Sequence, residues 1–385
     1  MLNYSIFLTT APTLVSYLEK EILSLGFKDF SPAGTGVKLV ATFPDIMFLN
    51  LHLRTAHHIY LLVKEFNSEN PEELYKNIYS VPWENFIAND GYISITSNVT
   101  SPTIRDSRYA NLKCKDAIVD RLLEVSGRRP DSGSDRTKTV LYLYWKGKYG
   151  AIYIDTSGET LSRRSYRRIP LLAPLQEALA AAIIMATNWD LKTNFINPMC
   201  GSGTLAIEAA LMALNRAPSI ARKNFGFMHL KLFDAKIWQK MKSEAKQKEN
   251  DKINGKIIAT DINEKAIEAS RKNAALAGVE KYIEFVTCDY SQTPVPPNAG
   301  VIVLNPAYGI RMGEISELEK LYGGIGDFFK QKCAGYTGYI FSASISLFKK
   351  IGLKPKRKII FYNGDIDCRL YEYPLYIGTK RQSKL

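Results

Sequence analysis

Apolar residues along this chain of 385 residues change their spacing near position 170. Before that point, short alternating stretches are separated by amphipathic stretches. Leu14, Leu18, Ile22 and Leu25, for example, recur every three or four residues, the period of one helix face. This half is predicted to be α/β. We expect strands at 4–8, 37–42, 59–66 and 92–99, helices at 13–25, 46–55, 71–79 and 111–125, and a hairpin at 140–146 and 151–155.

Beyond residue 170, short apolar runs alternate with helical patterns. An apolar helix at 173–187 is followed by predicted strands at 194–197, 256–260, 283–287, 301–304 and 338–342, with further helices at 264–277 and 318–332. Such βαβ alternation predicts a mostly parallel, doubly wound sheet of the Rossmann type. The stretch 212–252 interrupts the alternation. We predict that it is an insertion with its own helix near 234–248.

The charge distribution indicates a polyanionic partner. Lys and Arg number 51 against 38 Asp and Glu, for a net charge of +13. Residues 101–170 contain 15 basic and 8 acidic residues. We expect phosphate contacts from the densest basic positions; a solvated face is the alternative. These positions are Arg128, Arg129, Arg163, Arg164, Arg167 and Arg168.

Several protein classes are disfavoured. No apolar run reaches the roughly 18 residues that span a bilayer, and residues 1–12 do not resemble a signal peptide. The five cysteines are widely spaced and form no C-x-x-C pair, which argues against zinc and iron–sulfur sites. We therefore expect a cytoplasmic protein with free thiols and no metal.

A glycine-containing motif occupies residues 197–204, Asn-Pro-Met-Cys-Gly-Ser-Gly-Thr, between a predicted strand and a predicted helix. Gly201 and Gly203 allow a tight turn and a close approach to a ligand, and the helix start offers free N–H groups. A dinucleotide fingerprint would need a third glycine, and Ile207 occupies that region. The motif alone therefore predicts a nucleotide-like ligand, with NAD or FAD disfavoured.

Acidic residues follow the next two predicted strands. Asp261 lies 60 residues after Gly201, farther than the roughly 20 residues of dinucleotide sites. Its carboxylate suits a ribose diol, although it could instead cap the helix that begins at Glu264. Asp289 could accept a hydrogen bond from the amino group of an adenine, or it could simply be a turn residue.

The fourth predicted strand ends in Asn305-Pro306-Ala307-Tyr308-Gly309. The Asn305 side-chain oxygen and the Pro306 carbonyl can accept hydrogen bonds from an exocyclic amine and stabilise positive charge on its nitrogen. Tyr308 can stack on a base that has left its helix. This pattern predicts group transfer to a base nitrogen.

Residues 197–204 and 305–311 together resemble the bacterial THUMP-containing class I methyltransferases, as do residues 161–167 and 173–180. That family includes 23S ribosomal RNA guanine-N2 methyltransferases, often labelled N6-adenine-specific DNA methylases. The resemblance implies a ferredoxin-like unit at 1–65, an RNA-binding THUMP domain at 66–160 and a Rossmann-like methyltransferase domain at 161–385.

The resemblance also implies S-adenosylmethionine as cofactor and RNA as substrate, with 23S ribosomal RNA as the expected one. Gly201 and Gly203 would line the methionine end of the cofactor, Asp261 its ribose and Asp289 its adenine. Asn305, Pro306 and Tyr308 would hold the target base. One departure is Ala307, where the family usually has proline, which would soften the loop. The full set expected at the cofactor is Glu177, Asn197, Pro198, Gly201, Gly203, Thr204, Asp261, Ile262, Asp289 and Tyr290.

Three functions remain open from sequence. Guanine N2 and adenine N6 are both exocyclic amino groups, so the Asn-Pro-x-Tyr pattern fits either. RNA is favoured over DNA because no helix-turn-helix or zinc motif is present. A third interpretation is an RNA-binding assembly factor that keeps the cofactor fold without catalysis.

Overall fold

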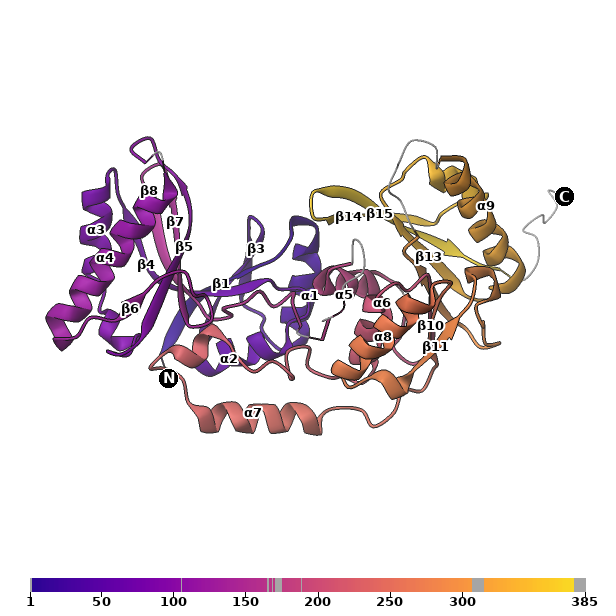
Figure 1. The fold of residues 1–385 in the computed structure, drawn as a ribbon, viewed down its shortest axis with the longest axis horizontal. Coiled ribbons are helices and arrows are strands. Elements are labelled where there is room, and N and C mark those ends of the chain that lie inside the picture. The colour runs from indigo at the N-terminus through magenta and orange to yellow at the C-terminus, as the bar shows by residue number, and fades with distance from the viewer. Residues whose placement is uncertain are drawn as a thin grey trace. The chain divides into compact units, whose positions relative to one another are not determined.

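A computed structural model describes residues 2–104, 106–164, 166, 167, 169, 175–187, 189–306 and 315–376. The chain divides into two compact units, each with its own sheet (Figure 1). Unit 1 contains Met1–Ser162 and Pro218–Ala245, and unit 2 contains Arg163–Ala217 and Lys246–Leu385. The chain therefore passes between the units three times.

Unit 1 is built on one eight-stranded sheet in the order β2-β3-β1-β4-β8-β7-β5-β6. β4 pairs with β1 on one side and with β8 on the other, so the two N-terminal segments share a continuous sheet. The short β2 and β6 were not expected; the other strands are confirmed. The strands are β1 (Asn3–Thr9), β2 (Phe30–Ala33), β3 (Gly36–Thr42), β4 (His58–Asn67), β5 (Tyr92–Thr100), β6 (Asp131–Ser132), β7 (Thr139–Lys146) and β8 (Tyr149–Asp155).

The four expected helices of unit 1 are confirmed and have local start and stop signals. Thr42 and Asp45 form a reciprocal capping box at the start of α2, which satisfies two otherwise unpaired N–H groups. Asp106 caps α4, and Gly127, with φ of +66°, ends it, as left-handed C-caps do. The helices are α1 (Val15–Ser24), α2 (Phe43–His52), α3 (Pro71–Tyr79) and α4 (Ser107–Ser126).

Residues 218–245, within the predicted insertion, pack with unit 1 rather than with the Rossmann-like sheet from which they depart. Phe225, Phe227 and Trp238 are buried there, with ring centroids 4.9–5.4 Å apart. The Arg222 guanidinium donates to the carbonyls of Ser157, Glu159 and Thr160. The helix expected near 234–248 is confirmed as α7 (Ala235–Gln247). The aromatic residues of the insertion are thus part of the core of unit 1.

Unit 2 contains the expected doubly wound sheet, in the order β11-β10-β9-β12-β13-β15-β14. The five strands β11, β10, β9, β12 and β13 are parallel. A hairpin that the sequence did not predict, β14–β15, adds two antiparallel strands at one edge. Strand order reverses between β9 and β12, the point at which such sheets bind ligands. The strands are β9 (Asn194–Pro198), β10 (Ile257–Asp261), β11 (Ile283–Thr287), β12 (Gly300–Leu304), β13 (Thr337–Ser342), β14 (Arg357–Asn363) and β15 (Ile366–Pro374).

Helices cover both faces of the sheet of unit 2, so β9 is buried along its whole length. Continuous burial is expected of parallel strands between two helical layers. The predicted helix at 173–187 is described as α5, from Glu177 onward. The helices are α5 (Glu177–Ala186), α6 (Thr204–Ala213), α8 (Glu264–Leu276) and α9 (Ile315–Lys332).

All five cysteines are free, and Cys114, Cys333 and Cys368 are buried. Burial raises the pKa of the Cys114 and Cys333 thiols, which makes them poor nucleophiles. In the described parts of the chain, no helix is both long enough and apolar enough to cross a membrane.

Candidate functional site

The predicted motifs meet at one edge of the sheet in unit 2. The glycine motif follows β9, Asp261 ends β10, Asp289 follows β11 and Asn305 follows β12. These four strands are parallel and adjacent in register, so their carboxyl ends lie together. Residues spread over more than one hundred positions therefore converge on the switch point of the sheet, the usual ligand position of this architecture.

The glycine motif forms a strained turn between β9 and α6. Met199, Gly201 and Gly203 all have positive φ, at 55°, 55° and 82°. At Gly203 an added Cβ would also lie 3.0 Å from the side chain of Ser270 on α8. No side chain caps the start of α6, so its first N–H groups remain available to an electron-rich ligand.

Asp261 ties the glycine turn to the end of β10. Its Oδ2 accepts from the Gly201 N–H at 3.0 Å, and its Oδ1 accepts from the Asn263 N–H at 3.0 Å. Asn263, not Asp261, caps α8, so the capping alternative is wrong. Each carboxylate oxygen can accept a second hydrogen bond, which leaves capacity for ligand hydroxyls.

The other expected cofactor residues on this side differ in their exposure and contacts. Ile262 is 72% exposed directly after Asp261, an apolar surface beside the turn. Asp289 Oδ1 accepts from the Ser291 N–H and hydroxyl, and its second oxygen has no hydrogen bond within the described residues. Tyr290 instead packs edge-on against Phe328 of α9, at 6.1 Å. This contact holds one side of the ring, and the cofactor role expected of Tyr290 stays a prediction.

Buried polar groups hold β9 and β12 together. The Asn197 side chain, fully buried, donates to the Val303 carbonyl of β12 at 2.8 Å. Pro198 and Thr204 are buried at the two ends of the motif. These three residues position the turn and are not exposed at its surface.

Asn305 presents a buried acceptor at the same edge. Its Oδ1 is shielded from solvent and has no hydrogen-bond partner among the described residues. An orphaned buried oxygen is costly and is rare unless a ligand or water completes it. Pro306 is also buried. Ala307 and Tyr308 lie outside the described residues.

Two of the expected phosphate-binding arginines are ion-paired with glutamates, and one of them, Arg164, is buried. The Arg164 side chain is 1% exposed, and its Nε lies 3.2 Å from Oε1 of Glu208, which also accepts from the Tyr166 hydroxyl. Arg167 pairs with Glu177 at 3.1 Å. This placement corrects the expectation for Arg164, because a buried, ion-paired guanidinium cannot reach a phosphate.

Glu177, expected at the cofactor, is part of the same network. Its side chain is 2% exposed and faces Arg167. Burial raises the pKa of its carboxyl, and Arg167 opposes that shift. Glu177 thus ties Arg167 to the first residue of α5. Sequence reasoning missed Glu208, whose only signal is a lone acid within the otherwise apolar α6.

Three other arginines of the expected set are described, and all three are on the surface. Arg128, Arg129 and Arg163 are exposed, as phosphate contacts require. Arg128 and Arg129 follow the C-cap of α4 in unit 1, whereas Arg163 opens unit 2. Arg168 lies outside the described residues.

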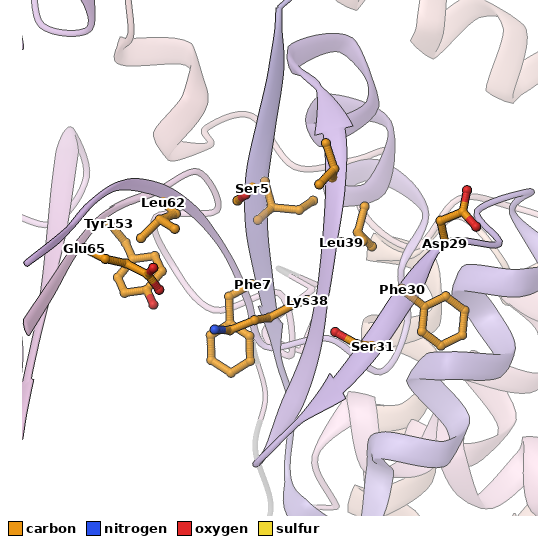
Figure 2. A pocket seen from close by; sticks show the side chains of 12 residues that line it. Ser5, Phe7, Asp29, Phe30, Ser31, Lys38, Leu39, Leu62, Glu65 and Tyr153 are labelled. Atoms are coloured by element: carbon orange, nitrogen blue, oxygen red, sulfur yellow. The ribbon is translucent and has the colours of Figure 1, made fainter. Parts of the chain in front are cut away.

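A separate cavity of about 560 Å³ lies on the sheet of unit 1. Figure 2 shows Phe7 and Lys38 on one wall and Tyr153, Leu62 and Glu65 on the other. Its lining belongs to β1–β4 and β8 and the residues next to them. It therefore contains none of the residues expected to bind the cofactor.

Comparison with known proteins agrees with this architecture. Residues 164–372, more than half of the chain, match the RMKL-like methyltransferase domain; residues 5–60 match the RlmL ferredoxin-like domain and 68–154 the THUMP domain. Ribosomal RNA large subunit methyltransferases K/L of Syntrophotalea carbinolica and Psychromonas ingrahamii are 33% and 36% identical over 96% and 97% of this chain. The chain spans about half the length of these relatives, 53% and 50%.

Solved structures share the fold along the whole chain. SMU.472, solved in complex with SAH, is 27% identical with a TM-score of 0.89, over 98% of this chain and all of that one. A possible methylase from Clostridium difficile 630 is 28% identical with a TM-score of 0.86, over 99% of this chain and all of that one. With its sheet order, its convergent motifs and the match over residues 164–372, the chain belongs to the RMKL-like methyltransferase-domain family.

Proposed function

We propose that this chain transfers a methyl group from S-adenosylmethionine to an exocyclic amino nitrogen of an RNA base, with guanine N2 of 23S ribosomal RNA as the expected target. The observation that carries the proposal is the Asn305 Oδ1, a buried acceptor without a partner among the described residues. It lies at the sheet edge that also carries the glycine turn and Asp261. An acceptor kept vacant beside a nucleotide-type site suits an incoming amine.

The residues present fit S-adenosylmethionine. A Cβ added to Gly201 would meet nothing within 4 Å, so space is open in front of the turn. The uncapped start of α6 faces that space, Asp261 keeps acceptor capacity for a ribose, and Asp289 keeps one for an adenine amine. The exposed Ile262 offers an apolar surface to the adenine ring. Binding of SAH by a relative of the same fold supports this assignment.

When bound, the cofactor supplies an electrophilic methyl group on a sulfonium. The protein must orient the amine, whose lone pair is delocalised into the base. Asn305 Oδ1 and the Pro306 carbonyl accept hydrogen bonds from the amine, aim its lone pair and stabilise the positive charge that develops on nitrogen. A strong base is unnecessary, since the nitrogen loses its proton only after it has become cationic.

Target capture requires a base outside its helix. We propose that Tyr308 stacks on that base, where base–aromatic stacking contributes about 1–3 kcal/mol. Arg128, Arg129 and Arg163 are proposed to contact phosphates, because they are exposed and the chain carries a net charge of +13. We propose that Arg168 also contacts a phosphate.

We further propose domains at 1–65, 66–160 and 161–385, supported by family matches at 5–60, 68–154 and 164–372. The ferredoxin-like and THUMP parts would recruit RNA. Five free thiols are consistent with the reducing cytoplasm, where we place the reaction.

An alternative target is adenine N6. A predicted N6-adenine-specific DNA methylase from Listeria monocytogenes is 28% identical with a TM-score of 0.87, over 97% of this chain and 96% of that one. Two acceptors on one amine do not distinguish the two bases.

The deciding experiment offers labelled S-adenosylmethionine and the protein to total RNA from a strain that lacks the gene. Mass spectrometry of the digested RNA then identifies the labelled nucleoside. N2-methylguanosine supports the proposal and N6-methyladenosine supports the alternative. Cofactor binding without transfer to any RNA would favour a non-catalytic assembly factor.

A further inference from the structure

The hairpin β14–β15 reaches past the sheet edge that carries the candidate site. β13 pairs with it only as far as Ser342, opposite Arg369, but the hairpin continues to the pair Asn363–Ile366. Each further residue adds about 3.3 Å, so three residues project the tip by about 10 Å. Figure 1 shows this two-stranded ribbon extending from the sheet.

The end of the hairpin, from Ile360 onward, exposes large apolar side chains on both faces. Ile360 and Tyr362, at alternate positions on one face, are 52% and 40% exposed. Ile366 is opposite Asn363 and therefore on the other face; it is 51% exposed. Scattered exposed apolar residues are ordinary, but a cluster at a projecting tip indicates an interaction site.

The hairpin is anchored rather than frayed. Phe361, between the two exposed residues of β14, is fully buried, and so is Cys368 opposite it. The strands are joined by two residues, the first being Gly364 with φ of +62°, as the tightest hairpin turns require. The exposed side chains are therefore held on a preformed support.

Register places the tip near Asn305, the proposed hydrogen-bond acceptor for the target amine. Leu304 is level with Ile340, Tyr371 and Lys358 across the sheet, so Asn305 is level with Ile359. Tyr362 lies three residues farther along the strand direction than Asn305, about 10 Å, and three strands away across the sheet, about 14 Å. The tip is thus less than about 20 Å from Asn305, within reach of bases that neighbour the target.

We propose that Tyr362 and Ile366 pack against the RNA bases next to the target and keep the target base out of its helix. This rests on the proposed function. Apolar side chains that enter a base stack stabilise unstacked nucleic acid, and an aromatic ring stacks on any base. Residues 345–369 carry seven Lys and Arg against two Asp, and both Asp are at the tip. Four of the cations are ion-paired with carboxylates, so phosphate contacts are left to Lys349, Lys354 and Lys358.

The test uses two RNA fragments made after the modified nucleotide has been mapped, one with the target base paired and one with a mismatch opposite it. The full-length double variant Tyr362→Ser/Ile366→Ser should lose about tenfold or more in single-turnover methylation of the paired RNA, because stacking energy is lost. On the mismatched RNA the target base is already unpaired, so the loss of activity should be much smaller.

Leu276→Ser is the matched control. Leu276 is 45% exposed at the last residue of α8, at the end of that helix away from the site, and its variant should methylate both RNAs normally. Tyr362→Phe should keep the activity, since it keeps the ring. Melting curves and cofactor affinity of the double variant should match the wild type. Unchanged rates on both RNAs, or equal losses on both, would overturn the proposal. A wild-type chain inactive on both would instead overturn the proposed function, and this proposal with it.

Discussion

Asn305→Ala should separate activity from stability. The Asn305 Oδ1 is buried and has no partner among the described residues, and such an atom destabilises the folded state by about 1–3 kcal/mol. Alanine removes that penalty and forfeits roughly 1 kcal/mol of side-chain packing. The free energy of unfolding should therefore stay the same or rise by up to about 2 kcal/mol. Turnover should fall by about 10²-fold or more, as when one preorganised polar group is removed.

Asn194→Ala is the matched control at the opposite end of β9. The Asn194 amide donates to the Asn298 carbonyl at 3.1 Å and the Tyr336 hydroxyl at 2.9 Å, and its Oδ1 accepts from the Lys256 N–H at 2.9 Å. Loss of three hydrogen bonds should lower the free energy of unfolding by about 2–4 kcal/mol. The chemical rate per folded molecule should not change.

Two measurements decide the comparison. Denaturant unfolding gives the stability of each variant, and single-turnover methylation with saturating RNA gives the chemical step. Calorimetry should show that Asn305→Ala binds S-adenosylmethionine nearly as the wild type does, because we propose that Asn305 contacts the target base and not the cofactor. If Asn305→Ala were destabilised by about 2 kcal/mol or more, or methylated at a normal rate, the residue would be structural and the reasoning wrong.

Three further changes test the site. Asp261→Ala should weaken S-adenosylmethionine binding by roughly 1.5–3 kcal/mol in calorimetry, because it removes a charge-assisted acceptor; unchanged affinity would refute its assignment. Replacing Arg128, Arg129 and Arg163 by alanine should flatten the dependence of RNA affinity on salt by about one counterion for each phosphate that is no longer neutralised; an unchanged slope in filter binding would make them a solvated surface. Arg164→Met should leave that slope unchanged but lower stability by about 3–5 kcal/mol, since it strands a buried carboxylate; a normal melting curve would contradict the buried pair.

Local signals were enough for most elements and motifs. The βαβ periodicity predicted the order of strands and helices in unit 2, since buried parallel strands appear as short apolar runs. The antiparallel hairpin β14–β15 was missed, because its strands mix charged residues with apolar residues on both faces. The local pattern also could not predict which sheet the insertion packs against, since apolar residues such as Phe225 and Trp238 could be buried against either one.

By itself the sequence determined which residues meet at the candidate site: the glycine turn, Asp261, Asp289 and Asn305 each lie at the end of an apolar strand, and strand ends in a parallel sheet meet at one edge. Only the tertiary structure decided which of the neighbouring arginines are buried and which are exposed. Arg164 turns inward to Glu208, whereas Arg163 stays on the surface. The reason is that burial of a charge depends on whether a partner from a distant helix, here α6, meets it, and no local pattern contains that partner.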